Sequence, residues 1–392
     1  MGDLPVEAAR SGDPGRVAEA LATVAVLAAR GDTTVIERFT AQVSGEETAA
    51  GADLAAARFL DRAVDGGWSP ADLHAAALRR LDAFATGYLT DRMAAHRTGR
   101  AADPGETWQD QLGELGAAAW WDTGRPHLPQ WAERALLTDR EAQAAALHAL
   151  ALLAALPRLH GAGPAAAPGR PAHRHVDARA LGRVRGLLAK AESTAFPEEA
   201  ETLSAKAQEL MTRYAIDHAL LAADDPDRPA ARRIWLDTPY TDAKALLVDR
   251  VARANGCRAI FLADWGFVTV VGDDADLDGV ELLATSLLVQ ATRTMIDTAG
   301  AAETRSRHYR KAFLTAYAAR IGDRLAAAAA ATVADAPDTD RLLPALAART
   351  ARVERAFDTY FPAARAKGIT LRSAEGWEAG TAAADQAHLG GG

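Results

Sequence analysis

Hydrophobic residues recur at helical spacing along much of this chain, and the clearest pattern lies between residues 177 and 222. In its first half, one helical face carries Leu181, Val184, Leu187, Leu188 and Ala191. After Pro197, which suits a first helical turn, a second face carries Ala200, Leu203, Ala207, Leu210, Met211 and Tyr214. Two amphipathic helices joined by a short turn bury their apolar faces against each other or a partner, so this segment predicts an αα-hairpin.

The residues of this hairpin also form a distinctive series, LLAKAES, then FPEEAE, then KAQELM. The series resembles the bacterial family called domain of unknown function 2786, which occurs mostly in actinobacteria and phages. The close resemblance covers roughly 177–221, and a looser one extends from about 170 to the end of the chain. Phe196 stands where the family often has Thr. The resemblance implies no activity, because none is assigned to the family.

Upstream of the hairpin, residues 1–156 have the pattern of an alanine-rich, all-helical domain. Ser44 and Glu47 have capping-box spacing, and Ser69 followed by Pro70 predicts the start of a long helix that ends near Arg97. This part also contains five tryptophans, Trp68, Trp108, Trp120, Trp121 and Trp131. Tryptophans can line a ligand pocket, but among small alanine side chains we expect them to fill the core.

Residues 157–176 are rich in Pro, Gly and Ala and predict a linker between domains. This segment contains His173 and His175. Two histidines alone do not complete a metal-binding set, so we expect them to be solvated parts of the linker.

From about residue 232 the pattern changes to mixed α and β. Apolar runs predict strands in RRIWLDT, CRAIFLA and FVTVVG, the last two joined across Asp264-Trp265-Gly266. Helices are expected over 242–255 and after Gly272. The resulting order, β-α-β-β-α over 232–330, predicts a small antiparallel sheet covered by helices on one side.

The rest of the chain, 331–392, is expected to be helical. Residues 326–338 form an alanine-rich stretch that we interpret as a connection before a helix over about 342–360. Gly376, Gly380 and Ala384 follow at four-residue steps, which favours close packing against another backbone. The expected fold is therefore mainly α, with an N-terminal helical domain, a hairpin packed with a small α+β unit, and C-terminal helices.

The formal net charge of −8 argues against a protein that coats nucleic acid or an anionic membrane with its whole surface. Cys257 is the only cysteine, which excludes an internal disulfide and fits a reducing cytoplasm. We expect its side chain in the core beside a strand. The N-terminus, MGDLPVEAARSGD, lacks the pattern of a secretory signal, and the longest apolar run, 144–156, is too short to span a bilayer. These features predict a cytoplasmic protein with no membrane partner.

Positive charge nevertheless gathers in the linker and the first hairpin helix. Seven basic residues there oppose only Asp177 and Glu192, and they are Arg158, Arg170, Arg174, Arg179, Arg183, Arg185 and Lys190. Such a group can contact phosphates. The acid-rich second helix and the DDPD sequence at 224–227 can neutralise it instead, and solvation or intramolecular pairing is our expectation.

A second basic segment combines cations with rings, because Tyr309, Phe313 and Tyr317 follow one another at helical spacing among basic residues. Interleaved cations and rings suit a nucleic-acid strand. The same spacing is typical of a core stripe beside a solvated basic flank, which we expect here. The candidate nucleic-acid-binding residues of the two segments are Arg179, Arg183, Arg185, Arg305, Arg307, Arg310 and Lys311.

The acidic run before the second α+β helix has the spacing of a metal site. It opens like a calcium loop, with Asp274, Asp276, Asp278 and Gly279, but Thr285 stands where that loop needs a bidentate Glu. We expect instead that Asp278 caps the following helix and that Glu281 completes its capping box. The sequence predicts no metal ion and no other cofactor.

Three functions are compatible with this sequence, which lacks the motifs HExxH, GxSxG, GxxxxGK and CxxC. The first is a cytoplasmic binding or adaptor module, with nucleic acid or another protein as partner, whose two basic segments share one face. The second is an enzyme of unknown reaction with carboxylates at the junction of hairpin and sheet, and its candidate residues are Lys190, Glu192, Glu199 and His308. It requires these side chains to converge in a pocket. The third is a purely structural interaction protein.

Overall fold

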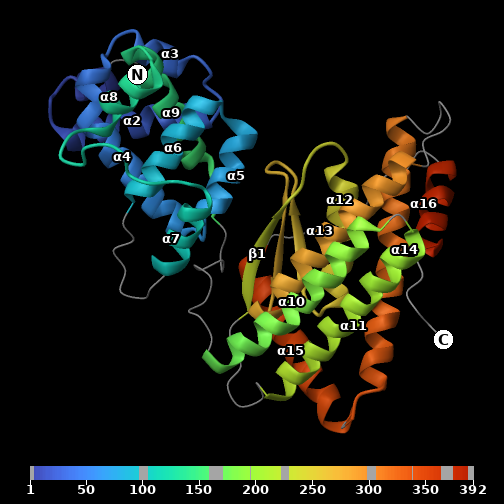
Figure 1. Ribbon diagram of the computed structural model, residues 1–392. Helices are drawn as coiled ribbons and strands as arrows, with labels where there is room; N and C mark the ends of the chain where they lie inside the picture. The colour runs from blue at the N-terminus through green and yellow to red at the C-terminus, as the bar shows by residue number, and fades with distance from the viewer. Residues whose placement is uncertain are drawn as a thin grey trace. The chain divides into compact units, whose positions relative to one another are not determined.

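The computed structural model describes residues 4–96, 105–158, 171–194, 196–221, 229–297, 306–337, 339–362 and 374–386. The chain divides into two compact units, Met1–Ala167 and Pro168–Gly392, called here the N-terminal and the C-terminal unit. Among the described residues, the N-terminal unit is helical and the C-terminal unit adds one three-stranded sheet (Figure 1). The predicted mainly α fold with a small α+β part is confirmed. A search of the described helices finds none with the length and apolarity needed to cross a membrane.

The N-terminal unit contains helices α1 to α9. Their bounds are α1 Leu4–Ala9, α2 Pro14–Ala29, α3 Val35–Thr40, α4 Gly45–Asp65, α5 Pro70–Arg80, α6 Ala83–Ala95, α7 Gly105–Glu114, α8 His127–Ala135 and α9 Asp139–Ala155. Helices α2, α4 and α9 pack together around a core of alanine and larger aliphatic side chains.

Two helix caps of this unit are formed by the residues that the sequence predicts. Ser44 and Glu47 form the predicted capping box of α4, and the Ser69 side chain accepts a hydrogen bond from the Asp72 amide at the start of α5. The single long helix predicted from Pro70 to Arg97 is wrong, because α5 ends at Arg80. Asp82 then accepts a hydrogen bond from the Ala85 amide and starts α6 as a new helix.

Most of the tryptophans of this unit fill its core, as expected. Trp68, Trp108, Trp121 and Trp131 are buried, whereas Trp120 is 36% exposed. The fully buried His127 has its ring 4.4 Å from the Trp121 ring, centre to centre, and its Nε2 lies 3.0 Å from Asp91. The Trp120 indole N–H donates to the same carboxylate at 2.9 Å, so Asp91 ties the 115–126 loop to α6.

The C-terminal unit contains the sheet and the remaining helices. Their bounds are α10 Pro171–Ser193, α11 Pro197–Leu221, β1 Ala230–Trp235, α12 Thr241–Ala254, β2 Arg258–Leu262, β3 Phe267–Gly272, α13 Asp274–Asp297, α14 Arg307–Ala334, α15 Thr339–Tyr360 and α16 Ala374–Gln386. Helix α10 begins at Pro171, so His173 and His175 belong to this helix and not to a linker as predicted. The DDPD sequence at 224–227 lies outside the described residues.

The predicted αα-hairpin is present as α10 and α11, which lie side by side in Figure 1. Its apolar face does not form a separate core. Val184 and Leu188 of α10 and Ala207 and Met211 of α11 are buried in one cluster with α12, α13, α14 and the sheet. The hairpin therefore docks on the mixed α and β segment that follows it, as its amphipathic pattern requires.

The sheet is antiparallel with strand order β1-β3-β2. Side chains of the central strand β3 alternate between two covered faces. Val268 and Val270 join the large core, whereas Val271 packs with Val353 and Phe357 of α15. The expectation that helices cover only one side is thus wrong, and the continuous apolar run FVTVVG is the sequence signal of a strand buried on both faces.

Cys257 is buried beside β3, as predicted, and its sulfur occupies the space next to Gly272. Burial raises the pKa of the Cys257 thiol to about 12, so the thiol stays protonated. Such a cysteine is a packing residue and not a nucleophile.

Helix α14 is longer than predicted, because most of the alanine-rich stretch 326–338 continues it as far as Ala334. Alanine has the highest helix propensity, so a run of alanines extends a helix as readily as it connects two. The predicted close approach is confirmed at Gly380 of α16, where a Cβ atom would lie 2.2 Å from the Phe313 carbonyl oxygen. The surroundings of Gly376 and Ala384 are not among those that the structure describes.

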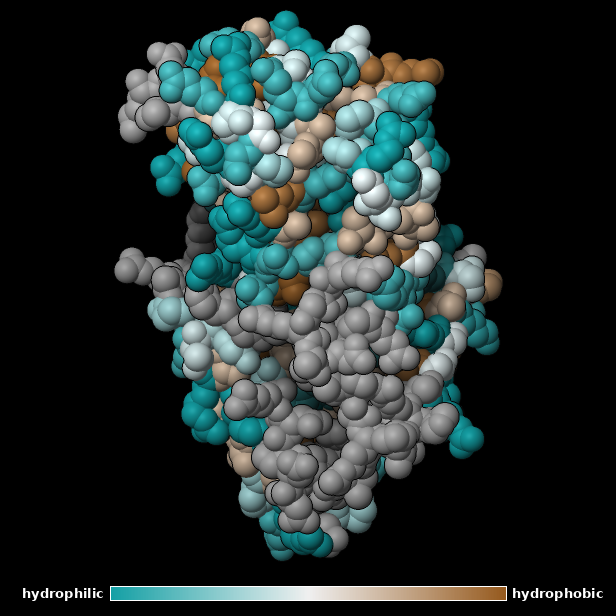
Figure 2. All heavy atoms as spheres, turned by 90° about the vertical axis from the view of Figure 1, so that its left-hand side faces the viewer, coloured by the Kyte–Doolittle hydropathy of each residue, from teal (hydrophilic) through white to brown (hydrophobic). Residues whose placement is uncertain are grey.

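Most of the described side chains on the face shown in Figure 2 are hydrophilic. The described hydrophobic side chains on this face form small separate groups among them. This is the usual surface of a protein whose apolar residues are used in its cores.

Candidate functional site

The outward half of α10 carries several cations, which are spread around the helix. Because Val184 and Leu188 point into the core, helical geometry places Arg179, Arg183 and Arg185 outward, and all three are exposed. We call these three residues the α10 basic face. Their exposure agrees with the expectation that the charges of this basic group are solvated.

The arginines of this face form no ion pair with any described residue. Some exposed arginines elsewhere on the surface have acidic partners, as with Arg213 and Glu209 at 2.6 Å. Gly182 and Gly186 lie on the same side of α10, and a Cβ atom at either position would meet no atom within 4 Å. The face is therefore positively charged and sterically open.

The second predicted basic segment is arranged differently. The rings of Tyr309, Phe313 and Tyr317 are buried in the core of the C-terminal unit, with at most 6% exposed. They cannot stack on nucleic-acid bases, so the core interpretation of this stripe is confirmed. Of its cations, Lys311 pairs with Asp242 of α12, and Arg310 is partly buried.

The other two cations of this segment are Arg305 and Arg307. Arg307 is exposed at the start of α14, and Arg305 lies outside the described residues. Arg307 is therefore a solvent-facing cation of the second basic segment. No described contact joins the start of α14 to the α10 basic face. That the two basic segments share one face stays a prediction.

The residues proposed for catalysis form only one ion pair within the described part of the chain. The Lys190 ammonium lies 3.7 Å from the Glu199 carboxylate across the hairpin turn, and both side chains are largely exposed. Glu192 and His308 are also exposed. None of the four lines either of the two cavities of the C-terminal unit described below, and a pocket that encloses them stays a prediction.

The acidic run after β3 is used for ion pairs with arginines. Helix α13 starts at Asp274, so Asp278 lies inside it and does not cap it as predicted. Asp278 and Glu281 instead bind Arg232 of β1. Asp276 and the preceding Asp273 bind Arg349 of α15, with Asp273 at 2.7 Å. The calcium-loop interpretation is wrong, since its first acids lie on a helix and point to arginines.

A local hydrogen-bond network orders the turn of the hairpin. Phe196 donates its amide hydrogen to the Thr194 hydroxyl at 3.2 Å, and this hydroxyl donates to Glu199 at 2.6 Å. Thr194 thus orders the turn even though Phe196 stands directly before Pro197.

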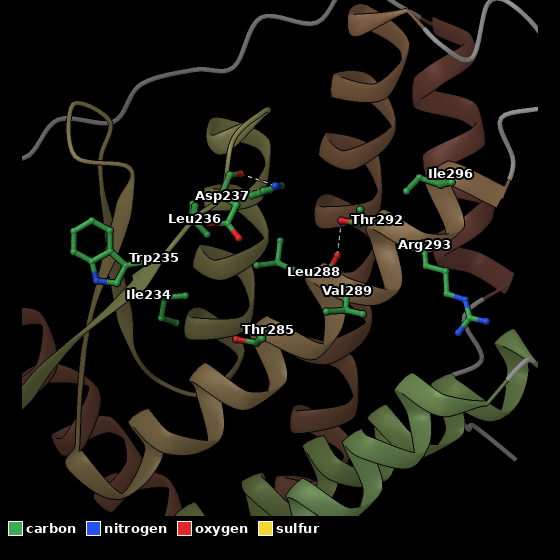
Figure 3. A pocket seen from close by; sticks show the side chains of 11 residues that line it. Ile234, Trp235, Leu236, Asp237, Thr285, Leu288, Val289, Thr292, Arg293 and Ile296 are labelled. Atoms are coloured by element: carbon green, nitrogen blue, oxygen red, sulfur yellow. Dashed lines mark hydrogen bonds between the residues drawn. The ribbon is translucent and has the colours of Figure 1, made fainter. Parts of the chain in front are cut away.

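The described residues of the C-terminal unit line at least two cavities. One, of about 750 Å³, is formed by α10, α11 and the alanine-rich end of α14. The other, of about 520 Å³, lies between the end of β1, the first turns of α12 and the second half of α13, and is called here the α13 cavity (Figure 3). Sequence reasoning missed it, because a cavity depends on how three distant segments meet. The available signal was the apolar pair Val289 and Ile296 on a helix whose opposite side is also apolar.

Comparison with known proteins identifies one segment of the chain. Residues 179–218 match a protein family described as a protein of unknown function, DUF2786. The hairpin matches DUF2786. The predicted resemblance is therefore confirmed for α10 from Arg179 onward and for nearly all of α11. No curated protein matches the chain, and no solved structure matches it.

Proposed function

We propose that the C-terminal unit is a binding module that contacts nucleic-acid phosphates through the α10 basic face. The observation that carries the proposal is that Arg179, Arg183 and Arg185 are exposed and form no ion pair with any described residue. Guanidinium groups bind phosphates through two parallel hydrogen bonds, and each such contact releases counterions from the nucleic acid.

The chemistry of this face favours contact with the sugar-phosphate backbone over recognition of bases. The described outward positions of α10 carry arginine, glycine, alanine, lysine, glutamate and serine, and no ring that could stack on a base. Gly182 and Gly186 leave room for the sugar-phosphate backbone of a nucleic acid to approach the helix. Binding through such a face is independent of sequence and depends strongly on salt.

The net charge of −8 fits a local contact of this kind and not a protein that wraps nucleic acid. As part of the proposal we keep the cytoplasmic location, which a single buried cysteine favours. The hairpin is then the binding element of a larger assembly or adaptor, and the N-terminal unit has a separate role.

The test is the affinity of the full chain for a labelled DNA duplex, measured by fluorescence anisotropy at several salt concentrations. The variant Arg179→Gln/Arg183→Gln/Arg185→Gln should bind more weakly, and its dependence of log Kd on log salt should decrease by about 0.9 for each phosphate that it no longer neutralises. Weak binding with a flat salt response in the unsubstituted chain contradicts the proposal.

A matched control removes the same charge from arginines that have partners. In Arg38→Gln/Arg213→Gln/Arg253→Gln, each substituted arginine is exposed and pairs with an acid in its own unit. The net charge of both triple variants is equal, so general electrostatic attraction changes equally. The control should keep most of the affinity, and equal losses in the two variants would show that the α10 basic face has no special part.

A further inference from the structure

The α13 cavity has the size and lining of a small-molecule site. Its volume of about 520 Å³ lies within the range of roughly 300–1,000 Å³ that is typical of ligand pockets. Five aliphatic side chains provide much of the lining, Ile234, Leu236, Leu288, Val289 and Ile296. Figure 3 shows that they come from two sides, the end of β1 and the exposed side of α13.

Two of these aliphatic side chains are unusually open to water. Val289 is 48% exposed and Ile296 is 58% exposed, although Leu283 and Leu287 of the same helix are fully buried. Removing apolar surface from water is favourable by about 25 cal/mol per Å². An apolar group that enters the cavity and covers Val289 and Ile296 therefore gains free energy that the unliganded protein lacks.

The polar part of the lining consists of a few groups at its margin. The Lys244 ammonium donates one hydrogen bond to the Asp237 carbonyl oxygen at 2.6 Å, and the Asp237 carboxylate also acts on its charge electrostatically. Burial lowers the pKa of Lys244, which reflects partial loss of water around its charge. An anion placed beside this ammonium would replace the missing water.

A second cation lies on the α13 side. Arg293 lines the cavity and donates to the Glu192 carbonyl oxygen at 3.3 Å, so one end of its guanidinium is fixed. Asp237 is the single acidic residue of the lining, and its negative charge disfavours binding of an anion. The lining is nevertheless positive by one charge in a chain whose net charge is −8.

From this arrangement we propose that the α13 cavity binds a small amphipathic anion, with an alkyl or aryl body against Leu288, Val289 and Ile296 and an anionic head group at Lys244. The proposal is independent of the α10 basic face, which lines no part of this cavity. It concerns binding alone and includes no chemical step.

Binding of 8-anilinonaphthalene-1-sulfonate, an amphipathic anion whose fluorescence rises in apolar sites, tests the proposal. The full chain should bind it saturably, and decanoate should displace it, whereas the cationic decyltrimethylammonium of equal chain length should not. The variant Lys244→Met keeps the aliphatic stem and should weaken decanoate binding at least about tenfold, because a hydrogen bond to a charged group is lost. Displacement by both amphiphiles alike, or unchanged decanoate binding in Lys244→Met, would overturn the anion assignment.

A second variant tests the location. Val289→Glu places a charge in the apolar lining at an exposed position and should abolish saturable binding, whereas Leu343→Glu makes the same kind of change at an exposed leucine of α15 and should not. Circular dichroism checks that both variants fold, and Ile296→Glu replaces Val289→Glu if the latter does not. Equal binding by the α13 and α15 variants, or no saturable binding by the unsubstituted chain, would overturn the proposal.

Discussion

The side-chain amides of Gln208 and Asn255 form a reciprocal pair that joins the hairpin to the end of α12. Gln208 donates to the Asn255 side-chain oxygen at 3.0 Å, and Asn255 donates back to the Gln208 oxygen at 3.2 Å. Gln208 is completely buried, and it also donates to the Thr212 hydroxyl at 3.1 Å. A polar side chain at this depth is stable only because it is hydrogen-bonded.

Replacing either amide should destabilise the C-terminal unit. We expect Gln208→Ala and Asn255→Ala each to lower the free energy of unfolding by about 1–3 kcal/mol, because each leaves a partly or fully buried partner unsatisfied. Urea unfolding followed by circular dichroism measures the change. The double variant should lose less than the sum of the two, and strictly additive losses would contradict a direct pair. Lys206→Ala, at an exposed position of the same helix, is the control.

Leu136 is a strained residue whose replacement should stabilise the N-terminal unit. It ends α8 in the left-handed conformation, with φ of 56°, and its side chain is 92% exposed. Leu136→Gly removes the steric cost of this conformation and should raise the free energy of unfolding by about 0.5–1 kcal/mol. The matched change Leu78→Gly, at another exposed leucine but inside α5, should lower it by about 1 kcal/mol. Thermal unfolding compares the two, and a loss of stability in Leu136→Gly would refute the strain argument.

The capping boxes of α4 and α9 should make the N-terminal unit sensitive to acid. The amide and hydroxyl of Ser44 donate to Glu47, and those of Thr138 donate to Glu141. The Ser44 amide lowers the pKa of Glu47, and the Thr138 hydroxyl lowers the pKa of Glu141, both from an ordinary value of 4.5. Because folding lowers both pKa values, their contribution to stability is complete above pH 4.5 and is lost as the pH falls below it.

The variant Glu47→Gln/Glu141→Gln should therefore be less stable at neutral pH and should lose less stability between neutral and acidic pH. Urea unfolding at a series of pH values measures this dependence. The control Glu19→Gln/Glu133→Gln changes two exposed glutamates outside the capping boxes, with the same change in charge. If the capping-box variant and the control showed the same pH dependence, the two hydrogen-bonded carboxylates would not be responsible.

Local patterns in the sequence were sufficient to predict those structural elements that depend on residues close together along the chain. The hairpin followed from apolar spacing on α10 and α11, and the starts of α4 and α5 followed from Ser44 and Ser69. The end of the helix after Pro70 was missed, because Asp82 has the same side chain whether it caps a helix or lies within one. Only the packing around it decides which of the two occurs.

Contacts between distant segments account for the other differences. Asp278 and Glu281 have the spacing of a capping box, but α13 begins at Asp274, and Arg232, 46 residues before Asp278, binds Asp278 on the side of this helix. The second covered face of the sheet depends on Val353 and Phe357, which follow Val271 of the central strand only after most of α13, α14 and the first half of α15. Such contacts between distant residues cannot be predicted from a single sequence.

The candidate sites also differ in whether they depend on local patterns or on contacts between distant segments. The exposure of Arg179, Arg183 and Arg185 could be predicted, since it needs only the apolar stripe of one helix. The pairing of Lys311 with Asp242 and the cavity beside Val289 could not, because each requires elements from different parts of the chain to meet.

The shared core of the C-terminal unit also affects how the DUF2786 match is to be used. The matched residues, 179–218, bury Val184, Leu188, Ala207 and Met211 against side chains that come from as far along the chain as Leu325. A peptide cut at the borders of the match would hold two helices without the surface that keeps them together. In this chain, the matched residues are therefore one part of a larger packed unit, Pro168–Gly392, and we expect the hairpin not to fold when it is cut from that unit.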